Sequence, residues 1–285
     1  MEQKKVEQEI KANWCLQEKD RLRKWNDTES KMKKYIFSVV NSDINLLILI
    51  SRPGLSKTFT TETTLDTLGT KYIKITGHCT PLELYKLLYE NRNGVIFIDD
   101  TQVLLESPSS RSLIMAAVWA ATSNNRTITY ASSTSKLDGI DNRFEFTGKV
   151  IICANSIPRK CEAMCSRGLF YEFNHNRNTV ITKMKDISSN KNIPAEIVQH
   201  IENITTLANL EISLRDLHIA YELYKKHKDW KSLVANQLKA KDEDIILLRS
   251  MECCAKTSDQ LAMFIRKSGM SRTTFFRKKR MLEEE

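Results

Sequence analysis

The chain has 285 residues, 41% of them apolar, so it can bury the core of one large domain or of a medium domain with small additions. No apolar run approaches the roughly 18 residues of a membrane helix, and residues 1–34 lack the apolar segment of a signal peptide, so we expect a cytoplasmic protein with no membrane contact. The formal net charge of +9 suits a polyanionic partner, although many ordinary proteins carry a similar charge.

Residues 1–35 carry ten Lys and Arg and seven Asp and Glu, with only sparse apolar positions between them. Such a narrow apolar stripe predicts one or two exposed helices. We expect this segment to be a charged N-terminal extension, which is either solvated or used as an arm for self-association.

The texture of the sequence changes at residues 46–50, Leu-Leu-Ile-Leu-Ile, a continuous apolar run that ends before Pro53 and Gly54. A short run bounded by turn residues predicts a strand buried on both faces, as in a parallel sheet. Further strands are predicted at residues 71–75, 95–98, 126–130, 144–146 and 149–154, and helices at 81–91, at 109–122 and from 57 onwards. Strands that alternate with helices predict an α/β fold around a mostly parallel sheet.

Strand signals stop after about residue 178, and residues 194–250 have helical periodicity with short breaks near Leu210 and Asp229. We therefore expect four segments. They are the extension at 1–35, an α/β core at 36–180, a helical lid at 181–228 and a second helical unit at 229–285.

Residues 51–58, Ser-Arg-Pro-Gly-Leu-Ser-Lys-Thr, fit the P-loop pattern G-x-x-x-x-G-K-[ST] except that Ser51 and Ser56 replace its glycines. The predicted order of strand, loop and helix N-terminus is the arrangement that binds phosphate through backbone N–H groups. Lys57 is expected to reach the β- and γ-phosphates of ATP, and Thr58 to hold Mg²⁺. Serine is small enough for a close approach, but a left-handed backbone is strained there. The residues expected to contact the nucleotide are Pro53, Gly54, Leu55, Ser56, Lys57, Thr58 and Phe59.

A second motif follows forty-two residues after Lys57, where the apolar run Val-Ile-Phe-Ile at 95–98 ends in Asp99 and Asp100. A carboxylate at the end of a buried strand is placed to hold Mg²⁺ beside a P-loop, which is the Walker B pattern. We expect Asp99 to face the metal and Asp100 to orient or deprotonate the attacking water.

These two motifs together resemble the AAA+ superfamily over about residues 36–225, and the segment 144–167 is similar to ATPases of phages, plasmids and integrated mobile elements. The resemblance implies that Asn155 contacts the γ-phosphate or the attacking water and that Arg167 is an arginine finger acting on a neighbouring subunit. It also implies that Arg215 is the arginine of the lid. A homo-oligomeric ring follows from the same resemblance, with a hexamer as the favoured size.

The sequence departs from that family at its second acid, where Asp100 stands for the usual Glu and is one methylene shorter. Slow hydrolysis, or nucleotide binding without efficient hydrolysis, is therefore an open alternative. The two arginines also have structural alternatives, because Arg167 lies near Glu172 in sequence and Arg215 is adjacent to Asp216 and close to Glu211. Arg143 is a rival for the finger.

The last segment, residues 257–282, predicts two short helices joined by the turn Ser268-Gly269-Met270-Ser271. Ser258 is expected to cap the first helix, and Phe275 and Phe276 to face inward from the second. Two helices with a Gly-containing turn are typical of a helix-turn-helix, and seven Lys and Arg with no acid lie between residues 266 and 280. We expect the major groove of DNA to be read by Arg272, Thr273, Thr274 and Arg277, and phosphates to be contacted by Lys278, Lys279 and Arg280. The alternative is a basic hairpin that packs on the ATPase or binds a protein.

The leading hypothesis is therefore a DNA-acting AAA+ ATPase for replication of a mobile element, working as an initiator, a helicase or a helicase loader. A nucleotide-switched DNA-binding regulator with weak hydrolysis is the first alternative. A protein-remodelling ATPase, with residues 1–35 as its adaptor, is the second.

Overall fold

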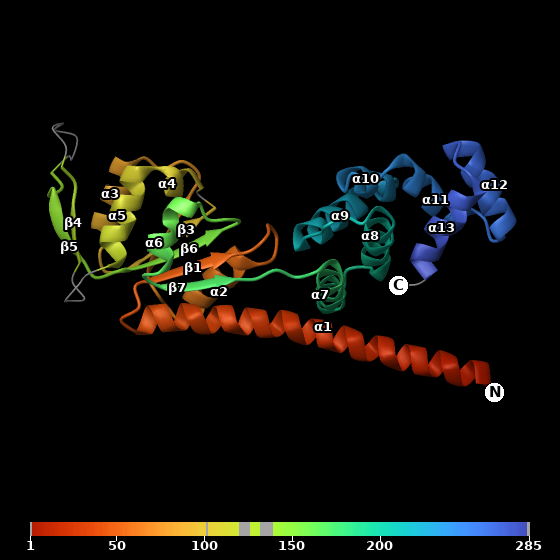
Figure 1. Cartoon of the computed structure of the whole chain (residues 1–285), viewed down its shortest axis with the longest axis horizontal. Helices are drawn as coiled ribbons and strands as arrows, with labels where there is room; N and C mark the ends of the chain where they lie inside the picture. Colours follow the sequence, from red (N-terminus) through yellow and green to blue (C-terminus); the bar gives the residue numbers. More distant parts are fainter. Residues whose placement is uncertain (1, 101, 120–125, 132–138, 284–285) are drawn as a thin grey trace. The chain divides into compact units, whose positions relative to one another are not determined.

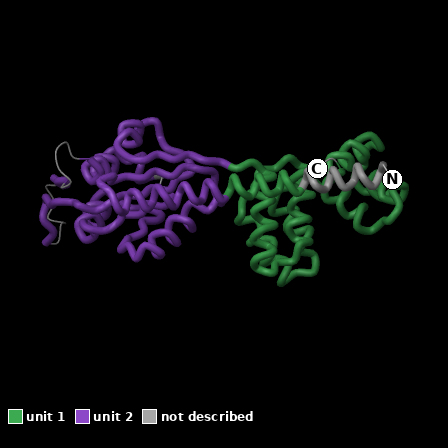
Figure 2. The backbone as a smooth tube through the Cα atoms, turned by 90° about the horizontal axis from the view of Figure 1, so that it is seen from below, with its two compact units in different colours: residues 1–25, 175–285 green, residues 26–174 purple. Residues whose placement is uncertain are grey.

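The computed structural model describes residues 2–100, 102–119, 126–131 and 139–283. The chain forms two compact units, which are described separately below (Figure 2). Unit 2 comprises residues 26–174, and unit 1 comprises residues 1–25 together with 175–285. Within the described part of the chain, no helix is both long enough and apolar enough to cross a membrane.

Unit 2 is built on a five-stranded sheet in which every neighbouring pair is parallel, in the order β2-β3-β6-β1-β7 (Figure 1). The strands are β1 (Leu46–Ile50), β2 (Tyr72–Thr76), β3 (Val95–Asp99), β6 (Lys149–Ala154) and β7 (Leu169–Glu172). The α/β fold with a parallel sheet is thus confirmed. β7 was not predicted, because its alternating exposure is that of an edge strand rather than of a continuous apolar run.

The central strands have the burial that their sequences predict. All five residues of β1 are buried, as are the apolar residues of β3 and residues 150–154 of β6. Each fully buried Leu or Ile side chain stabilises the fold by about 1.5–3 kcal/mol relative to its exposure to water. The sheet is therefore a rigid base whose carboxyl ends can hold side chains in fixed positions.

Helices connect the strands of this sheet. They are α2 (Lys57–Thr67), α3 (Pro81–Glu90), α4 (Gln102–Glu106), α5 (Pro108–Val118) and the one-turn α6 (Glu162–Cys165), which a 3-10 turn at Arg159–Cys161 precedes. The side chains of Thr80 and Ser107 cap α3 and α5, each directly before a proline in the first turn. The helix predicted at 109–122 is α5, which ends at Val118, and residues 120–122 lie outside the described residues.

The predicted strands at 126–130 and 144–146 are β4 (Arg126–Thr129) and β5 (Arg143–Phe146), but they do not join the parallel sheet. They pair with each other as an antiparallel ribbon. Exposed and buried residues alternate along both strands, so one face packs on the core and the other meets solvent.

In the described residues of unit 1, all regular secondary structure is helical. Its helices are α7 (Arg177–Asn190), α8 (Ala195–Ala208), α9 (Leu214–Lys226), α10 (Trp230–Gln237), α11 (Asp242–Cys253), α12 (Thr257–Ser268) and α13 (Arg272–Glu283). A second apolar core, which includes Ile204, Leu247, Phe264 and Phe275, joins α8 to α11, α12 and α13.

The predicted N-terminal extension is one continuous helix, α1 (Glu2–Asn41), that contributes to both units. In unit 1 the ring of Trp25 stacks on His175 with centroids 4.5 Å apart, and Lys185 Nζ lies 3.0 Å from Glu18 Oε1. In unit 2 Met32, Ile36 and Val39 are buried. Because its apolar positions enter two cores, α1 is part of the folded molecule.

Candidate active site

The loop between β1 and α2 has the backbone of a phosphate-binding turn. Gly54 and Ser56 are left-handed, with φ of 74° and 69°, whereas Ser51 does not have a positive φ. A left-handed backbone costs an ordinary L-residue about 1–2 kcal/mol, so only the second of the two serines carries the expected strain. In the described part of the chain, the backbone N–H groups of Gly54, Leu55 and Ser56 form no hydrogen bond, which leaves them available to an anion.

Lys57 begins α2 and its side chain turns back into this loop. It is only 7% exposed, and Nζ donates to Ser51 O at 2.6 Å, Ser51 Oγ at 3.0 Å and Arg52 O at 3.1 Å. A further hydrogen bond of 3.2 Å joins Nζ to Oδ1 of Asn155, directly after β6. The loop lysine and the predicted sensor asparagine are therefore in contact, ninety-eight residues apart in sequence.

Asp99, the last residue of β3, and Asp100, which follows it, form hydrogen bonds with a residue of α2 and with a residue that follows β6. Thr58 Oγ1 donates to Asp99 Oδ1 at 2.8 Å, and Asn155 Nδ2 donates to Asp100 Oδ1 at 2.8 Å. Asp100 is left-handed, with φ of 54°, and its N–H bonds to Cys153 O. Aspartate tolerates this conformation better than most residues do, so the turn directs the second acid toward β6.

The structure thus brings together Lys57, Thr58, Asp99, Asp100 and Asn155 at the carboxyl ends of β1, β3 and β6. This edge of a parallel sheet is where α/β folds bind ligands. The hydroxyl of Thr58 and the carboxylate of Asp99 are hard oxygen ligands of the kind that Mg²⁺ prefers, and their 2.8 Å separation lets both face one ion. The donor set and the unpaired N–H groups of the loop therefore fit a nucleotide with its metal.

Sequence reasoning missed one charged group of this site, Lys74 of β2. Its Nζ lies 3.1 Å from Asp99 Oδ2 and 2.9 Å from Glu62 Oε1 on α2. Burial opposes its charge, but the hydrogen bonds with Glu62 and Asp99 outweigh that effect, so the pKa of Lys74 is raised above its ordinary value. A lysine inside a strand that precedes the Walker B strand is the only signal that could have indicated it.

Arg167 follows α6 and makes aromatic and sulfur contacts. Its guanidinium lies 5.4 Å from the centroid of Trp119, and Nη1 is 3.7 Å from Met115 Sδ. Within the described residues it forms no ion pair with Glu172, so that alternative is not supported. The rival Arg143 is exposed on β5.

Arg215 is an exposed residue in the first turn of α9, in unit 1. Asp216, its proposed structural partner, accepts instead from the backbone N–H and the hydroxyl of Ser213. Arg215 forms no ion pair among the described residues, with Glu211 or with any other acid. Its role as the lid arginine stays a prediction.

The C-terminal helices agree with most, but not all, of the expected pattern. Gly269 ends α12 with φ of 68°, and the N–H of Thr274 bonds to Ser271 Oγ at the start of α13. The expected cap at Ser258 is wrong, because α12 begins at Thr257 and the Ser258 hydroxyl bonds to Asp259.

Two of the residues on α13 differ from expectation. Phe275 is fully buried, but Phe276 is 38% exposed under the guanidinium of Arg272, because adjacent helical residues point about 100° apart. Lys278 is buried and pairs with Asp244 and with Glu243 Oε1, the latter at 3.2 Å. Its ammonium is committed to α11, which corrects the expectation that it contacts a phosphate.

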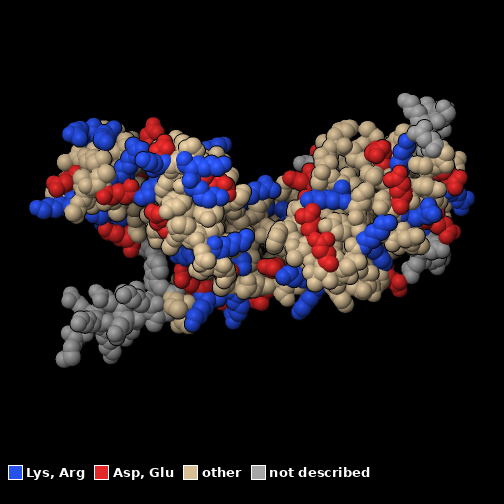
Figure 3. All heavy atoms as spheres, turned by 180° about the vertical axis from the view of Figure 1, so that it is seen from behind, with Lys and Arg blue, Asp and Glu red and all other residues tan. Residues whose placement is uncertain are grey.

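The remaining candidates for DNA contact lie on the open side of α13. Arg272, Thr273, Arg277 and Arg280 are exposed, while Thr274 is partly covered by its bond to Ser271. Lys279 is partly buried and donates to Thr257 Oγ1 and Gln260 Oε1 on α12, both at 3.1 Å. Figure 3 shows positive side chains over the helical unit that carries α12 and α13.

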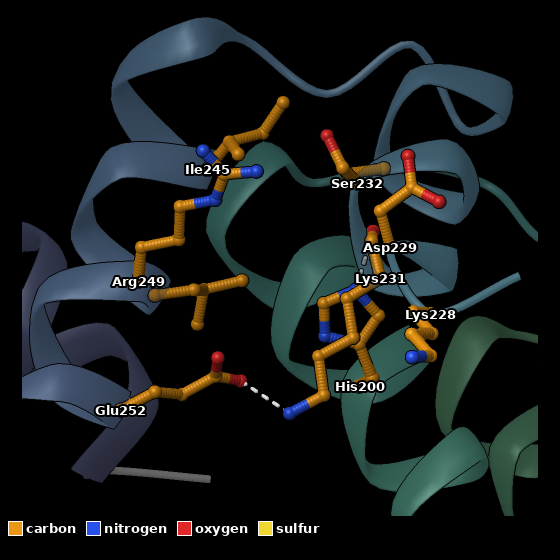
Figure 4. A pocket seen from close by; sticks show the side chains of 10 residues that line it. His200, Lys228, Asp229, Lys231, Ser232, Ile245, Arg249 and Glu252 are labelled. Atoms are coloured by element: carbon orange, nitrogen blue, oxygen red, sulfur yellow. Dashed lines mark hydrogen bonds and ion pairs between the residues drawn. The ribbon is translucent and has the colours of Figure 1, made fainter.

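A separate cavity of about 190 Å³ lies in unit 1 between α8, α10 and α11 (Figure 4). Its apolar lining includes Ala235 and Leu248. At its rim Lys231 Nζ donates to Glu252 Oε1 at 2.6 Å, and Lys231 O contacts Nε2 of the buried His200 at 2.9 Å. No residue predicted from the sequence lines this cavity, and its charges largely compensate one another, so we assign it no ligand.

Comparison with solved structures agrees with the fold. One variant of RuvB from Thermotoga maritima matches with a TM-score of 0.51 at 14% sequence identity, over 87% of this chain and 83% of that chain. A second variant of the same protein matches with a TM-score of 0.50 at 12% identity, over 88% of this chain and 84% of that chain. The replication initiator DnaA bound to AMPPCP and single-stranded DNA matches with a TM-score of 0.44 at 12% identity, over 89% of this chain and 86% of that chain. No protein-family model and no curated protein matches the sequence. The chain therefore shares its fold with these RuvB structures.

Proposed function

We propose that the protein is an AAA+ ATPase that binds and hydrolyses ATP with Mg²⁺ and acts on DNA. The observation that carries this proposal is the cluster of Lys57, Thr58, Asp99, Asp100 and Asn155 at one edge of the sheet, joined by hydrogen bonds of 2.8–3.2 Å. Each of these side chains has a chemical task in phosphoryl transfer, and they come from the start of α2 and from the carboxyl ends of β3 and β6.

Thr58 and Asp99 would hold Mg²⁺, which supplies charge neutralisation on the β- and γ-phosphates. Lys57 Nζ, which now donates to Ser51 O and Arg52 O, would donate to phosphate oxygens of the nucleotide instead. Asp100 keeps one carboxylate oxygen on Asn155 and has the other available to accept a proton from the attacking water. Asn155 contacts both Lys57 and Asp100, so it links the phosphate side of the site to the water side.

We further propose that the protein works as a homo-oligomeric ring, with a hexamer as the favoured size, in replication of a mobile element, as an initiator, helicase or helicase loader. Arg167 would act on the nucleotide of a neighbouring subunit, and Trp119 and Met115 would hold it extended for that contact. DNA would meet the exposed residues Arg272, Thr273, Arg277 and Arg280 on α13, with Lys279 and Thr274 at the margin.

The test is ATP turnover measured without DNA, with single-stranded DNA and with double-stranded DNA. We expect DNA to stimulate turnover and Lys57→Ala to abolish it, while Lys71→Ala, at an exposed lysine, leaves it near wild type. Arg167→Ala should lose turnover and regain part of it when mixed with the Lys57→Ala protein, because each variant keeps the half-site that the other lacks. Absence of both ATP binding and DNA binding at moderate salt would refute the proposal.

A nucleotide-switched DNA-binding regulator is the second candidate. The strained Ser56 and the short Asp100, already bonded to Asn155, favour nucleotide binding with slow hydrolysis. This candidate predicts that ATP changes DNA affinity while DNA leaves turnover unchanged. A protein-remodelling ATPase would instead keep its function after deletion of residues 257–285.

A further inference from the structure

Lys74 occupies the part of the candidate site that a metal would need. β2 pairs in register with β3, so that Thr76 lies opposite Asp99 and Lys74 opposite Phe97. The lysine side chain passes along the Phe97 ring, with Nζ 5.5 Å from its centroid, and reaches the carboxylate two residues further along β3. The strand register thus places a positive charge beside the predicted metal ligand.

Both oxygens of Asp99 already have partners. Oδ1 accepts from Thr58 at 2.8 Å, and Oδ2 lies 3.1 Å from Lys74 Nζ. Glu62 of α2 shares the same ammonium at 2.9 Å, so one lysine serves two carboxylates. The Asp99 side chain is only 13% exposed, which means that water screens this contact less than it screens a surface pair.

We propose that Lys74 is a positioning residue that acts as a built-in cation: it holds Asp99 against Thr58 in the absence of metal and competes with Mg²⁺ for that carboxylate when nucleotide binds. This inference rests on the proposed nucleotide site. The competition follows from charge, since a divalent ion at Asp99 is repelled by an ammonium held beside the same carboxylate. Lys74 therefore raises the Mg²⁺ concentration needed for nucleotide binding and keeps the site ordered before nucleotide arrives.

A purely structural ion pair would predict something different. It would contribute little to the stability of unit 2, as partly exposed pairs generally do, and its loss would leave the Mg²⁺ dependence unchanged. The two accounts are therefore separated by a metal titration.

The experiment measures binding of a fluorescent, non-hydrolysable ATP analogue to the full chain as Mg²⁺ is titrated. We expect Lys74→Met, and equally Lys74→Gln if the methionine variant folds poorly, to lower the half-saturating Mg²⁺ concentration roughly three- to tenfold. Lys74→Arg keeps the charge and should stay within about twofold of wild type, as should Lys71→Met at the exposed lysine three residues earlier. Thermal unfolding in EDTA should show that Lys74→Met and Lys74→Gln lower the melting temperature and that added Mg²⁺ restores more of it than in wild type.

An unchanged or raised half-saturating concentration in both neutral variants overturns the inference. If the wild type binds the analogue and Lys57→Ala does not, such a result refutes the role of Lys74 alone. If the wild type fails to bind the analogue, the proposed site fails and the inference fails with it.

Discussion

The two serines that replace P-loop glycines should respond to glycine substitution in opposite directions. Ser56 has φ of 69° and its side chain forms no capping hydrogen bond, so Ser56→Gly removes strain without removing a cap. Relief of a left-handed L-residue contributes about 1–2 kcal/mol. The added flexibility of glycine in the unfolded chain takes back about 0.4–1 kcal/mol. The free energy of unfolding should therefore rise by roughly 0.5–1 kcal/mol.

Ser51, at the other end of the same loop, is the matched comparison for Ser56. It lacks a positive φ, is almost completely buried, and its hydroxyl accepts from Lys57 Nζ at 3.0 Å while donating to Arg52 O at 3.1 Å. Ser51→Gly loses a hydrogen bond to a charged group without relieving strain, so it should cost about 1.5–3 kcal/mol.

Scanning calorimetry of the nucleotide-free protein measures both changes. The expected rise in the free energy of unfolding for Ser56→Gly corresponds to an increase of about 1–3 °C in the melting temperature. Ser51→Gly should instead lower the melting temperature. A decrease for Ser56→Gly, or shifts of the same sign for both variants, would show that the loop conformation at Ser56 is not the strained one described above.

Three further predictions concern other parts of the chain. Lys278→Met should destabilise unit 1 by about 3 kcal/mol or more, because it leaves a buried acid unpaired, whereas Arg280→Ala should leave stability near wild type and reduce the salt dependence of DNA binding by about one unit of slope. Gly148→Ala should cost about 1–3 kcal/mol in urea unfolding, since its Cβ would lie 2.3 Å from the carbonyl oxygen of Gly94. Burial lowers the pKa of His200 below its ordinary 6.5, so the unfolded chain takes up this proton first and stability should fall as the pH drops through 6.5; His200→Gln should flatten that dependence.

Much of the fold could be predicted because its central strands are unbroken apolar runs in the sequence. The apolar runs at 46–50, 95–98 and 150–154 stand out against a charged background, and each is followed by polar residues of the site. β7 was not predicted because it is a short edge strand in which partly buried and exposed residues alternate. Residues 126–130 and 144–146 were recognised as strands, but nothing in a local pattern says which sheet a strand joins.

The site residues that belong to a short sequence motif could be predicted. The residues that reach the site from elsewhere in the chain through a long side chain could not. Lys57, Thr58 and the two acids follow from motif spacing. Lys74 and Lys278 pair with acids that are distant in sequence, and no local pattern indicates such a pair. Lys74 was therefore missed, and Lys278 was assigned to a phosphate. Phe276 was misjudged because two adjacent aromatics cannot share one helix face.

The path of α1 has a practical consequence for dissecting the molecule. Unit 2 is a single uninterrupted stretch of chain, residues 26–174, whereas unit 1 is assembled from two stretches separated by all of unit 2. A gene fragment can therefore encode unit 2 by itself, but any fragment starting at residue 175 lacks Trp25 and Glu18, which stack on His175 and pair with Lys185. Truncations meant to isolate α12 and α13 should be planned with this inserted topology in view.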